Sequence, residues 1–551
     1  MRFLRVILFL TLAAVAWLAG TLIPAYLRAV DLEVIRARGL RGPNLVHEAA
    51  GLIQKEALGL AELFYLAAAS LDVPEHEELG RFLEVYKQQH PEVARYGVAA
   101  AYLDPLFRDA SRRAEPRVLD LMLPEASRQR TLRMLQSSTR AGVQEVLDNR
   151  NLTNTTILPP VSSASGQALE TAILLTALLD RTDLIPDTLS QQIESYASAA
   201  NRGQGTEPIE AFYLDVLALA QNLNWAQFTG FMALIDRVET LRDLVRRSEN
   251  NVTNLAQLYC AAHLAGNAGL VAGYLRQYPQ DGMGHLRLAL QAGSESVREL
   301  LRKQRPVHRA RFREALMSRL PLDRPFGWML RLTLALPIVA LLLKYVLWLD
   351  AAFCLVRGVG WLLPHERTIE SPRVARQFGL YQQQVLALLL VLLAVALTEP
   401  SLARPEPEKP AAPRWRIPVL SAAVGAKVNE AIKPVMKEIN WIALVLFFVV
   451  QGSLYVLNLI KLREIKRQTV SSELKLRLLD NEEHMFDAGL YVGLGGTVLG
   501  LILPTFNVVQ PSLMVAYAST LFGILFVSLL KICHVRPYRR ALILDSTLGN
   551  L

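Results

Sequence analysis

Two threonine hydroxyls set in apolar sequence are the groups of this chain with the most definite chemistry. Thr497 lies in the apolar run 488–508 and Thr520 in the run 513–532. If both runs are membrane helices that rise 1.5 Å per residue, Thr497 lies roughly 15 Å and Thr520 roughly 18 Å from the inner surface. Hydroxyls at a similar depth can line a narrow polar path, or each can bond to a backbone carbonyl one turn back. The sequence leaves both interpretations open.

Glycines mark one helix face beside these threonines. Four of them follow one another at steps of four, three and four residues: Gly489, Gly493, Gly496 and Gly500. Residues at such steps share one face of a helix, and small residues let membrane helices approach closely. Gly523 follows Thr520 in the next run. We therefore expect these five glycines to pack helices together.

Six apolar segments are near the length that a membrane helix needs, about 20 residues. They cover 3–27, 326–349, 380–397, 441–460, 488–508 and 513–532. No clear small-x-small cleavage site follows the first segment, so we interpret it as a retained anchor rather than a cleaved signal peptide. Pro504 and Pro511 mark a tight turn that makes the last two segments a transmembrane hairpin.

The composition agrees with a protein of mixed environment. The 551 residues are 52% hydrophobic and 20% charged, and soluble domains average about 25% charged residues. The chain is therefore too apolar to be wholly soluble and too charged to lie wholly in a bilayer. Its net charge of +9 comes from basic residues beside the apolar segments, which favours membrane topology over nucleic-acid binding. Three distant cysteines predict neither a disulfide framework nor a Cys-rich metal site.

Lysine and arginine in the short loops predict the orientation. With the N-terminus inside, the inner segments 1–5, 350–379, 461–487 and 533–551 hold 15 of these residues and the outer loop 398–440 holds seven. The positive-inside rule then places both termini in the cytoplasm and residues 28–325 in the periplasm. At the end of the second apolar segment, we expect Lys344 and Asp350 to reach the inner interface; a charge relay is the alternative.

Residues 28–325 show helical periodicity and almost no strand alternation. Apolar positions recur every three and four residues, for example over 52–69 and 209–223. Leu219–Trp225 resembles Leu264–Leu270, 45 residues later. This spacing fits stacked helical hairpins, as in an α-solenoid, and an irregular helical bundle fits equally well. We expect this domain to bind a periplasmic or envelope protein.

No catalytic constellation appears in the sequence. The nine histidines are scattered, and His-Glu-x-x-His, Gly-x-Ser-x-Gly and phosphate-binding glycine loops do not occur. We therefore predict no enzymatic activity, no catalytic residues, no metal site and no cofactor. A solute transporter is disfavoured because the last two segments form no evident inverted repeat with the earlier ones.

Two short runs resemble a known family. Tyr491–Leu501, with the sequence Tyr-Val-Gly-Leu-Gly-Gly-Thr-Val-Leu-Gly-Leu, resembles the Gly-Leu-x-Gly-Thr-Val-x-Gly signature of the second channel helix in the MotA/TolQ/ExbB proton-channel family. Ala518–Gly523 is similar to the Ala-Thr-x-x-Gly pattern of that family's third helix. The order of the segments also agrees, and the resemblance covers about residues 438–540.

The resemblance implies a subunit of a proton-motive-force-driven motor or energy-transducing complex in the bacterial inner membrane. Five copies would surround a pore, and single-pass partners of the MotB/TolR/ExbD type would carry the proton on a membrane aspartate. Thr497 and Thr520 match the family's pore-facing threonines. Val515 stands where ExbB/TolQ-type proteins have a glutamate, so relay by that acid is not expected here. The alternative is an oligomeric membrane scaffold whose periplasmic domain binds an envelope partner without ion conduction.

Together these patterns predict an all-α, polytopic membrane protein in contact with membrane lipids. Its expected parts are an anchor at 1–27, the periplasmic helical domain at 28–325, two additional membrane helices with a short cytoplasmic loop at 326–398, a Pro-rich spacer with an interfacial amphipathic stretch at 399–440, a three-helix channel module at 441–540 and a cytoplasmic tail at 541–551.

Overall fold

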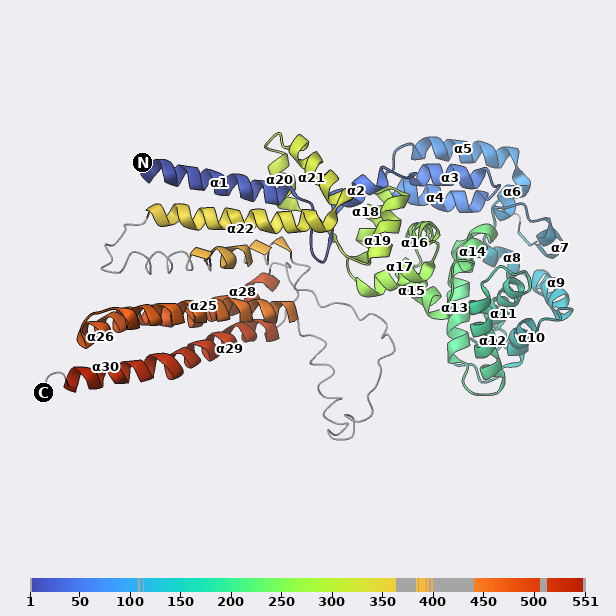
Figure 1. Cartoon of the computed structure of the whole chain (residues 1–551). Helices are drawn as coiled ribbons and strands as arrows, with labels where there is room; N and C mark the ends of the chain where they lie inside the picture. The colour runs from blue at the N-terminus through green and yellow to red at the C-terminus, as the bar shows by residue number, and fades with distance from the viewer. Residues whose placement is uncertain are drawn as a thin grey trace. The chain divides into compact units, whose positions relative to one another are not determined.

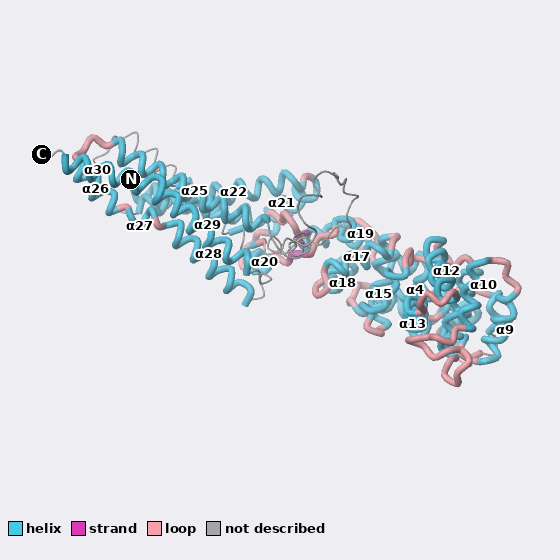
Figure 2. The backbone as a smooth tube through the Cα atoms, turned by 90° about the horizontal axis from the view of Figure 1, so that it is seen from below, coloured by secondary structure: helices cyan, strands magenta, loops and turns pink. Residues whose placement is uncertain are grey.

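The computed structural model confirms the all-α class. It describes residues 2–107, 110–111, 113–362, 383–384, 386–392, 394–395, 398–399, 441–505 and 513–548. These residues are overwhelmingly helical (Figures 1 and 2), with only the two-residue strands β1 (Val30–Asp31) and β2 (Val307–His308) among them. The chain divides into two compact units, one made of residues 1–29 and 310–551 and the other of residues 30–309. The predicted spacer, apart from Glu399, lies outside the described residues.

Three of the described helices are long and apolar enough to cross a membrane. They are Phe3–Leu22, Pro337–Trp361 and Tyr517–Ser546, and Ala488–Val498 is a shorter apolar stretch. The predicted segment 441–460 falls in α25 (Trp441–Arg467). The predicted segment 488–508 falls in α28 (Ala488–Thr505) up to residue 505, and its last three residues lie outside the described residues. Of the segment 380–397, residues 383–384, 386–392 and 394–395 are described and helical, and the other seven lie outside the described residues. Six membrane helices therefore remain a prediction, of which three meet the criteria of length and composition.

The second apolar segment is divided by a proline. Helix α21 (Asp323–Ala335) ends before Leu336, and α22 (Pro337–Leu362) begins at Pro337. A proline has no N–H and clashes inside a helix, but it fits the first helical position. Helix α22 consequently extends beyond the predicted end at 349, and Lys344 lies in its first third.

Helix α22 packs antiparallel to α1 (Arg2–Leu22). At one end, a Cβ on Gly20 would lie 3.3 Å from Lys344 O and would clash with the Trp348 ring. At the other end, the Arg5 guanidinium lies 5.4 Å from the centre of the Trp361 ring. The two helices are thus in contact along most of the length of α1.

Lys344 is buried in an ion pair, whereas the prediction was a side chain that reaches the inner interface from the end of its helix. Its Nζ lies 2.7 Å from Ala25 O and 3.1 Å from Glu399 Oε1. Tyr345 donates to the same carboxylate oxygen over 2.6 Å, and Leu27 N donates to Glu399 Oε2 over 3.1 Å. The side chains of Lys344 and Glu399 are 2% and 0% exposed. The pair joins three segments that are far apart in sequence.

Residues 30–309 form a helical domain in which most connections are short and the one over 152–166 is long. Its helices are α2 (Leu32–Gly39), α3 (Leu45–Ile53), α4 (Leu58–Ser70), α5 (His76–Gln89), α6 (Pro91–Tyr96), α7 (Asp104–Phe107), α8 (Val118–Met122), α9 (Glu125–Gln136), α10 (Ala141–Asp148), α11 (Gln167–Arg181), α12 (Asp187–Asn201), α13 (Glu207–Asn222), α14 (Trp225–Met232), α15 (Val238–Ser248), α16 (Val252–Ala265), α17 (Ala268–Gln277), α18 (Gly282–Ala292) and α19 (Ser294–Lys303). Helix α11 is buried on every side from Leu169 to Asp180 and forms part of the core.

The two ends of this domain meet. From α15 onward each helix packs on the next one and on the one after it, and α2 packs on α18 and α19. Strand β1 pairs in parallel with β2, with Val30 opposite Val307. The two similar sequence runs both end a helix and start another: Asn224 caps α14 and Asn267 caps α17. The domain is therefore one insertion whose entry and exit lie side by side.

Glu210 holds the extended segment before α11 in place. Its fully buried carboxylate accepts the N–H groups of Thr156, Ile157 and Leu158 over 2.6–2.9 Å. Burial raises the pKa of this carboxyl, but hydrogen bonds from Thr206 and from these backbone N–H groups outweigh burial and lower it overall. A lowered pKa in the folded state means that ionised Glu210 stabilises the fold above the ordinary glutamate pKa, and that this stabilisation is lost as the pH falls through the lowered pKa.

We predict that Glu210→Gln loosens the segment around residue 157. Glutamine has no charge, so the three backbone N–H groups would lose their charged acceptor and bond more weakly or not at all. The free energy of opening for the amides of Thr156, Ile157 and Leu158 should therefore fall by about 2–3 kcal/mol at neutral pH. Hydrogen exchange of the full chain measures this change. The difference between wild type and variant should shrink as the pH falls through the range in which Glu210 protonates. Equal protection at neutral pH would contradict the role given to this carboxylate.

Candidate functional site

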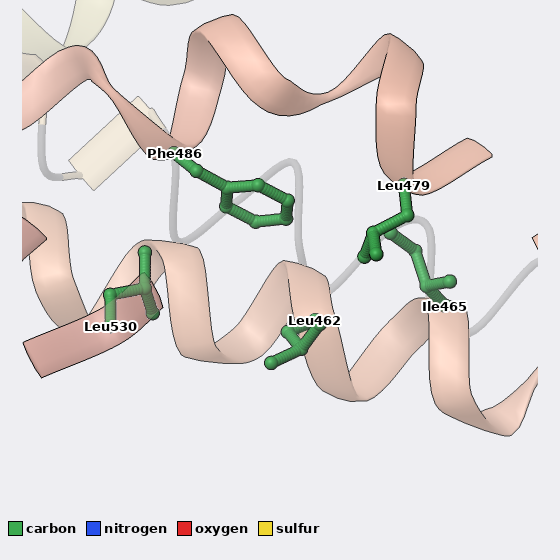
Figure 3. Packing of buried hydrophobic residues seen from close by; sticks show 5 residues of the cluster. All are labelled: Leu462, Ile465, Leu479, Phe486 and Leu530. Carbon is green, nitrogen blue, oxygen red and sulfur yellow. The ribbon is translucent and has the colours of Figure 1, made fainter. Parts of the chain in front are cut away.

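Three helices form the scaffold of the C-terminal site. Helices α25 and α28 pack with α29 (Leu513–Leu530), which continues through the π-helical turn η5 (Lys531–Val535) into α30 (Arg536–Leu548). Between α25 and α28 lie α26 (Ser472–Asn481) and α27 (Glu483–Phe486). One hydrophobic cluster holds one end of this assembly together (Figure 3): Leu462, Ile465, Leu479, Phe486 and Leu530. This cluster joins the C-terminal part of α25 and the last turn of α29 to α26 and α27.

The predicted glycine face lies at the contact between α28 and α29. A Cβ on Gly493 would lie 2.9 Å from Ser519 O and 3.3 Å from the Cα of Thr520. A Cβ on Gly523 would lie 2.7 Å from Gly489 O. Since real Cβ atoms do not approach backbone atoms so closely, only glycine permits this helix separation. Gly496 faces Ser519 and Phe447, whereas the surroundings of Gly500 lie outside the described side chains.

The structure brings the two predicted threonines into contact. Thr497 Oγ1 is hydrogen-bonded to Thr520 Oγ1. Each hydroxyl also lies within hydrogen-bond distance of Gly493 O, at 3.1 Å for Thr497 and 3.3 Å for Thr520. Ser519 donates to the same carbonyl over 3.0 Å. Thr497 is therefore hydrogen-bonded both to the carbonyl of the preceding turn, Gly493 O, and to the Thr520 hydroxyl of the facing helix.

The threonine pair lies on the side of the hairpin away from α25. Gly496, which precedes Thr497 and points about 100° away from it, is the residue that faces Phe447 of α25. On α29, Phe522 and Phe526 make the ring contacts with Phe448 of α25.

The side chains around the threonine pair are open. Thr497 and Thr520 are half-buried, whereas Ser519 is fully buried. Exposed apolar side chains flank the pair at helical spacing: Leu490, Leu494, Tyr517 and Ile524 are 39%, 58%, 63% and 47% exposed. We call these six residues the hydroxyl edge. It presents a small polar centre within an apolar surface.

Gln451 is a site residue that the sequence reasoning missed. This side chain of α25 is 1% exposed and donates from Nε2 to Gly489 O over 3.0 Å. A lone amide inside an apolar segment is a signal that could have found it, because polar groups there are costly unless they have partners. Gln451 thus connects α25 to the same glycine face that α29 contacts.

Charged groups gather where α28 begins. Lys531 Nζ lies 2.8 Å from Asp487 Oδ1 and 3.7 Å from Glu483 Oε1. Among the described residues, no group of three or more His, Cys, Asp or Glu side chains could hold a metal ion. Val515 lies in α29 with a side chain outside the described set.

Comparison of the chain with family models, curated proteins and solved structures finds no match. The geometry of the hydroxyl edge and the short motifs around it are therefore the features that bear on function.

We predict that Gly493→Ala separates α28 from α29. The new methyl group would meet the Ser519 carbonyl at 2.9 Å, and forced overpacking of this kind costs about 1–3 kcal/mol. Thermal unfolding of the detergent-purified full chain should show a lower midpoint. Gly495→Ala is the matched control, because a Cβ there meets nothing within 4 Å. Equal midpoints for the two variants would contradict the close contact.

Proposed function

We propose that this chain is a subunit of an inner-membrane complex that uses the proton motive force to do work in the cell envelope. The observation that carries the proposal is the hydrogen-bonded pair of Thr497 and Thr520 on the exposed hydroxyl edge. In the complex, the hydroxyl edges of several copies face a shared lumen, as in the MotA/TolQ/ExbB family that the motifs resemble.

The chemistry of the edge suits a proton path that needs a second component. A threonine hydroxyl has one donor and two acceptor lone pairs, so the pair can hold water in a chain of hydrogen bonds. It cannot carry a charge, and the hydroxyl edge contains no titratable carboxylate. The proton carrier in the lumen is therefore a membrane aspartate on a single-pass partner of the MotB/TolR/ExbD type. Five copies of this chain would surround that partner.

The domain of residues 30–309 gives the complex a part outside the membrane. Positive-inside counting assigns this domain to the periplasm. The first and last residues of this domain pair with each other in β1 and β2. Both connections to the rest of the chain therefore leave the domain at the same place. We propose that it binds an envelope protein. The membrane part would then move this protein or anchor it to the inner membrane.

A scaffold without ion conduction is the second candidate. The observation that favours it is that both threonine hydroxyls have hydrogen-bond partners within the subunit, including Gly493 O. The hydroxyls of such a hairpin need no water to satisfy their hydrogen bonds. In this alternative, the hydroxyl edge only joins copies of the chain, and dissipating the proton gradient has no effect on its activity.

We predict that Thr497→Val and Thr520→Val each reduce proton flux by tenfold or more and leave assembly intact, because valine keeps the shape and removes the hydroxyl. Flux is measured with a pH-sensitive dye in vesicles that contain the complex with its copurified partner. Thr333→Val is the matched control, since that hydroxyl also bonds one turn back, to Met329 O, but lies outside the three-helix module. Wild-type flux in both variants would reject the pore role, and absence of flux in the wild type would support the scaffold.

A further inference from the structure

Three polar side chains of α25 share one helix face. Gln451, Tyr455 and Asn458 are spaced by four and three residues, which places them on the same side of the helix. Leu462 and Ile465 continue this face and are buried against Leu479, Phe486 and Leu530. The polar side chains therefore point into the bundle, where a buried polar group is costly unless it is hydrogen-bonded.

Gln451 is only half satisfied by protein groups. Its Nε2 donates to Gly489 O, but its Oε1 is fully buried and has no hydrogen-bond partner among the described residues. An amide oxygen can accept two hydrogen bonds. A buried acceptor left without a partner costs about 1–3 kcal/mol. The position of Oε1 thus indicates a missing donor.

A small cavity lies next to this oxygen. It has a volume of about 10 Å³, and the polar residues Gln451, Tyr455 and Asn458 line it together with Gly489. The remaining walls are apolar and come from α25 and α29: Leu454, Phe526, Val527 and Leu530. One buried water needs about 10–15 Å³ and two to four polar partners. The cavity has the lower limit of this volume, and three polar side chains line it.

Gly489 keeps this space open. A Cβ at this position would lie 3.0 Å from Gln451 Oε1 and 2.9 Å from Val527 Cγ2. Any larger residue would therefore press on the oxygen that lacks a partner. Gly489 is needed both for the approach of α29 and for the space beside Gln451.

The cavity is connected to a titratable side chain through Tyr455. The Tyr455 hydroxyl lies 3.0 Å from His534 Nε2. His534 is half-buried and belongs to the π-helical turn η5, and such turns are frequent at functional sites. Gln451, Tyr455 and His534 thus form a polar column between α25 and α29.

We infer that the core of this module binds one water molecule, which donates to Gln451 Oε1 and bonds to Asn458. With Tyr455 and His534 it forms a hydrated column inside each subunit. The column lies on the α25 side of the hairpin, opposite the hydroxyl edge. It depends on the packing of α25, α28 and α29 and not on proton conduction at the threonines.

Hydroxyl-radical labelling of the detergent-purified full chain tests the water site. Water bound beside a side chain promotes its labelling even when bulk solvent does not reach it. Tyr455 should be labelled in the wild type, and after rapid transfer into ¹⁸O-water the label should stay ¹⁶O for longer than on an exposed tyrosine of the domain 30–309 such as Tyr102. Gln451→Met, which keeps length and removes the acceptor, should lower the labelling of Tyr455 several-fold. Thr497→Val, on the opposite edge, should leave it unchanged.

Two results would overturn the inference: no labelling of Tyr455 in the wild type, or equal labelling in wild type and Gln451→Met. Circular dichroism shows whether Gln451→Met folds. If it does not fold, a density map of the wild type that resolves ordered water tests the site instead. A peak within hydrogen-bond distance of Gln451 Oε1 supports the site, and an empty cavity overturns it. Loss of flux in the threonine variants bears on the proposed function alone.

Discussion

The backbone contact between α28 and α29 at Gly493 is the constraint on which the rest of the C-terminal module depends. Because no side chain fits between these helices, three hydroxyls reach one carbonyl, Gly493 O. The neighbouring glycines then decide which groups face α25, since Gly496 receives Phe447 and Gly489 receives Gln451. The same contact directs Thr497 and Thr520 to the other side, where they are half-buried. One steric fact therefore produces both a closed side and an open side of the hairpin.

Two buried charged groups elsewhere in the chain have the hydrogen-bond partners that burial requires. Glu210 receives three backbone N–H groups in the helical domain. Lys344 and Glu399 satisfy each other with help from Ala25, Leu27 and Tyr345. Removing one partner of such a buried pair leaves an uncompensated charge, which is far more costly than replacing both. Gln451 Oε1 is one of several buried side-chain atoms that lack a hydrogen-bond partner among the described residues, and the cavity lined by Gln451 is what indicates a ligand at this oxygen.

The sequence predicted the features that local periodicity encodes. Spacing of three and four residues gave the all-α class, and the steps between Gly489, Gly493 and Gly496 gave the face that contacts α29. It did not give pairings between residues far apart in the chain, such as Lys344 with Glu399 or Glu210 with residues 156–158, because no local pattern specifies a distant partner. The predicted position of Lys344 at the end of its helix was wrong, because α22 begins at Pro337 and Lys344 lies near its start. The role of Gln451 was missed because it depends on a carbonyl contributed by another helix.

In the proposed complex, the hydroxyl edges of several copies enclose one lumen. The hydroxyl edge combines exposed apolar side chains with a pair of hydroxyls. A shared lumen that holds a partner helix would bury the apolar side chains and the hydroxyls. An electron-microscopy map of the complex purified from its native membrane tests this arrangement most directly. The expected result is a ring of copies around central density, with Thr497 and Thr520 lining the centre. A single subunit without a lumen, or a ring whose threonines face the surrounding detergent, would contradict it.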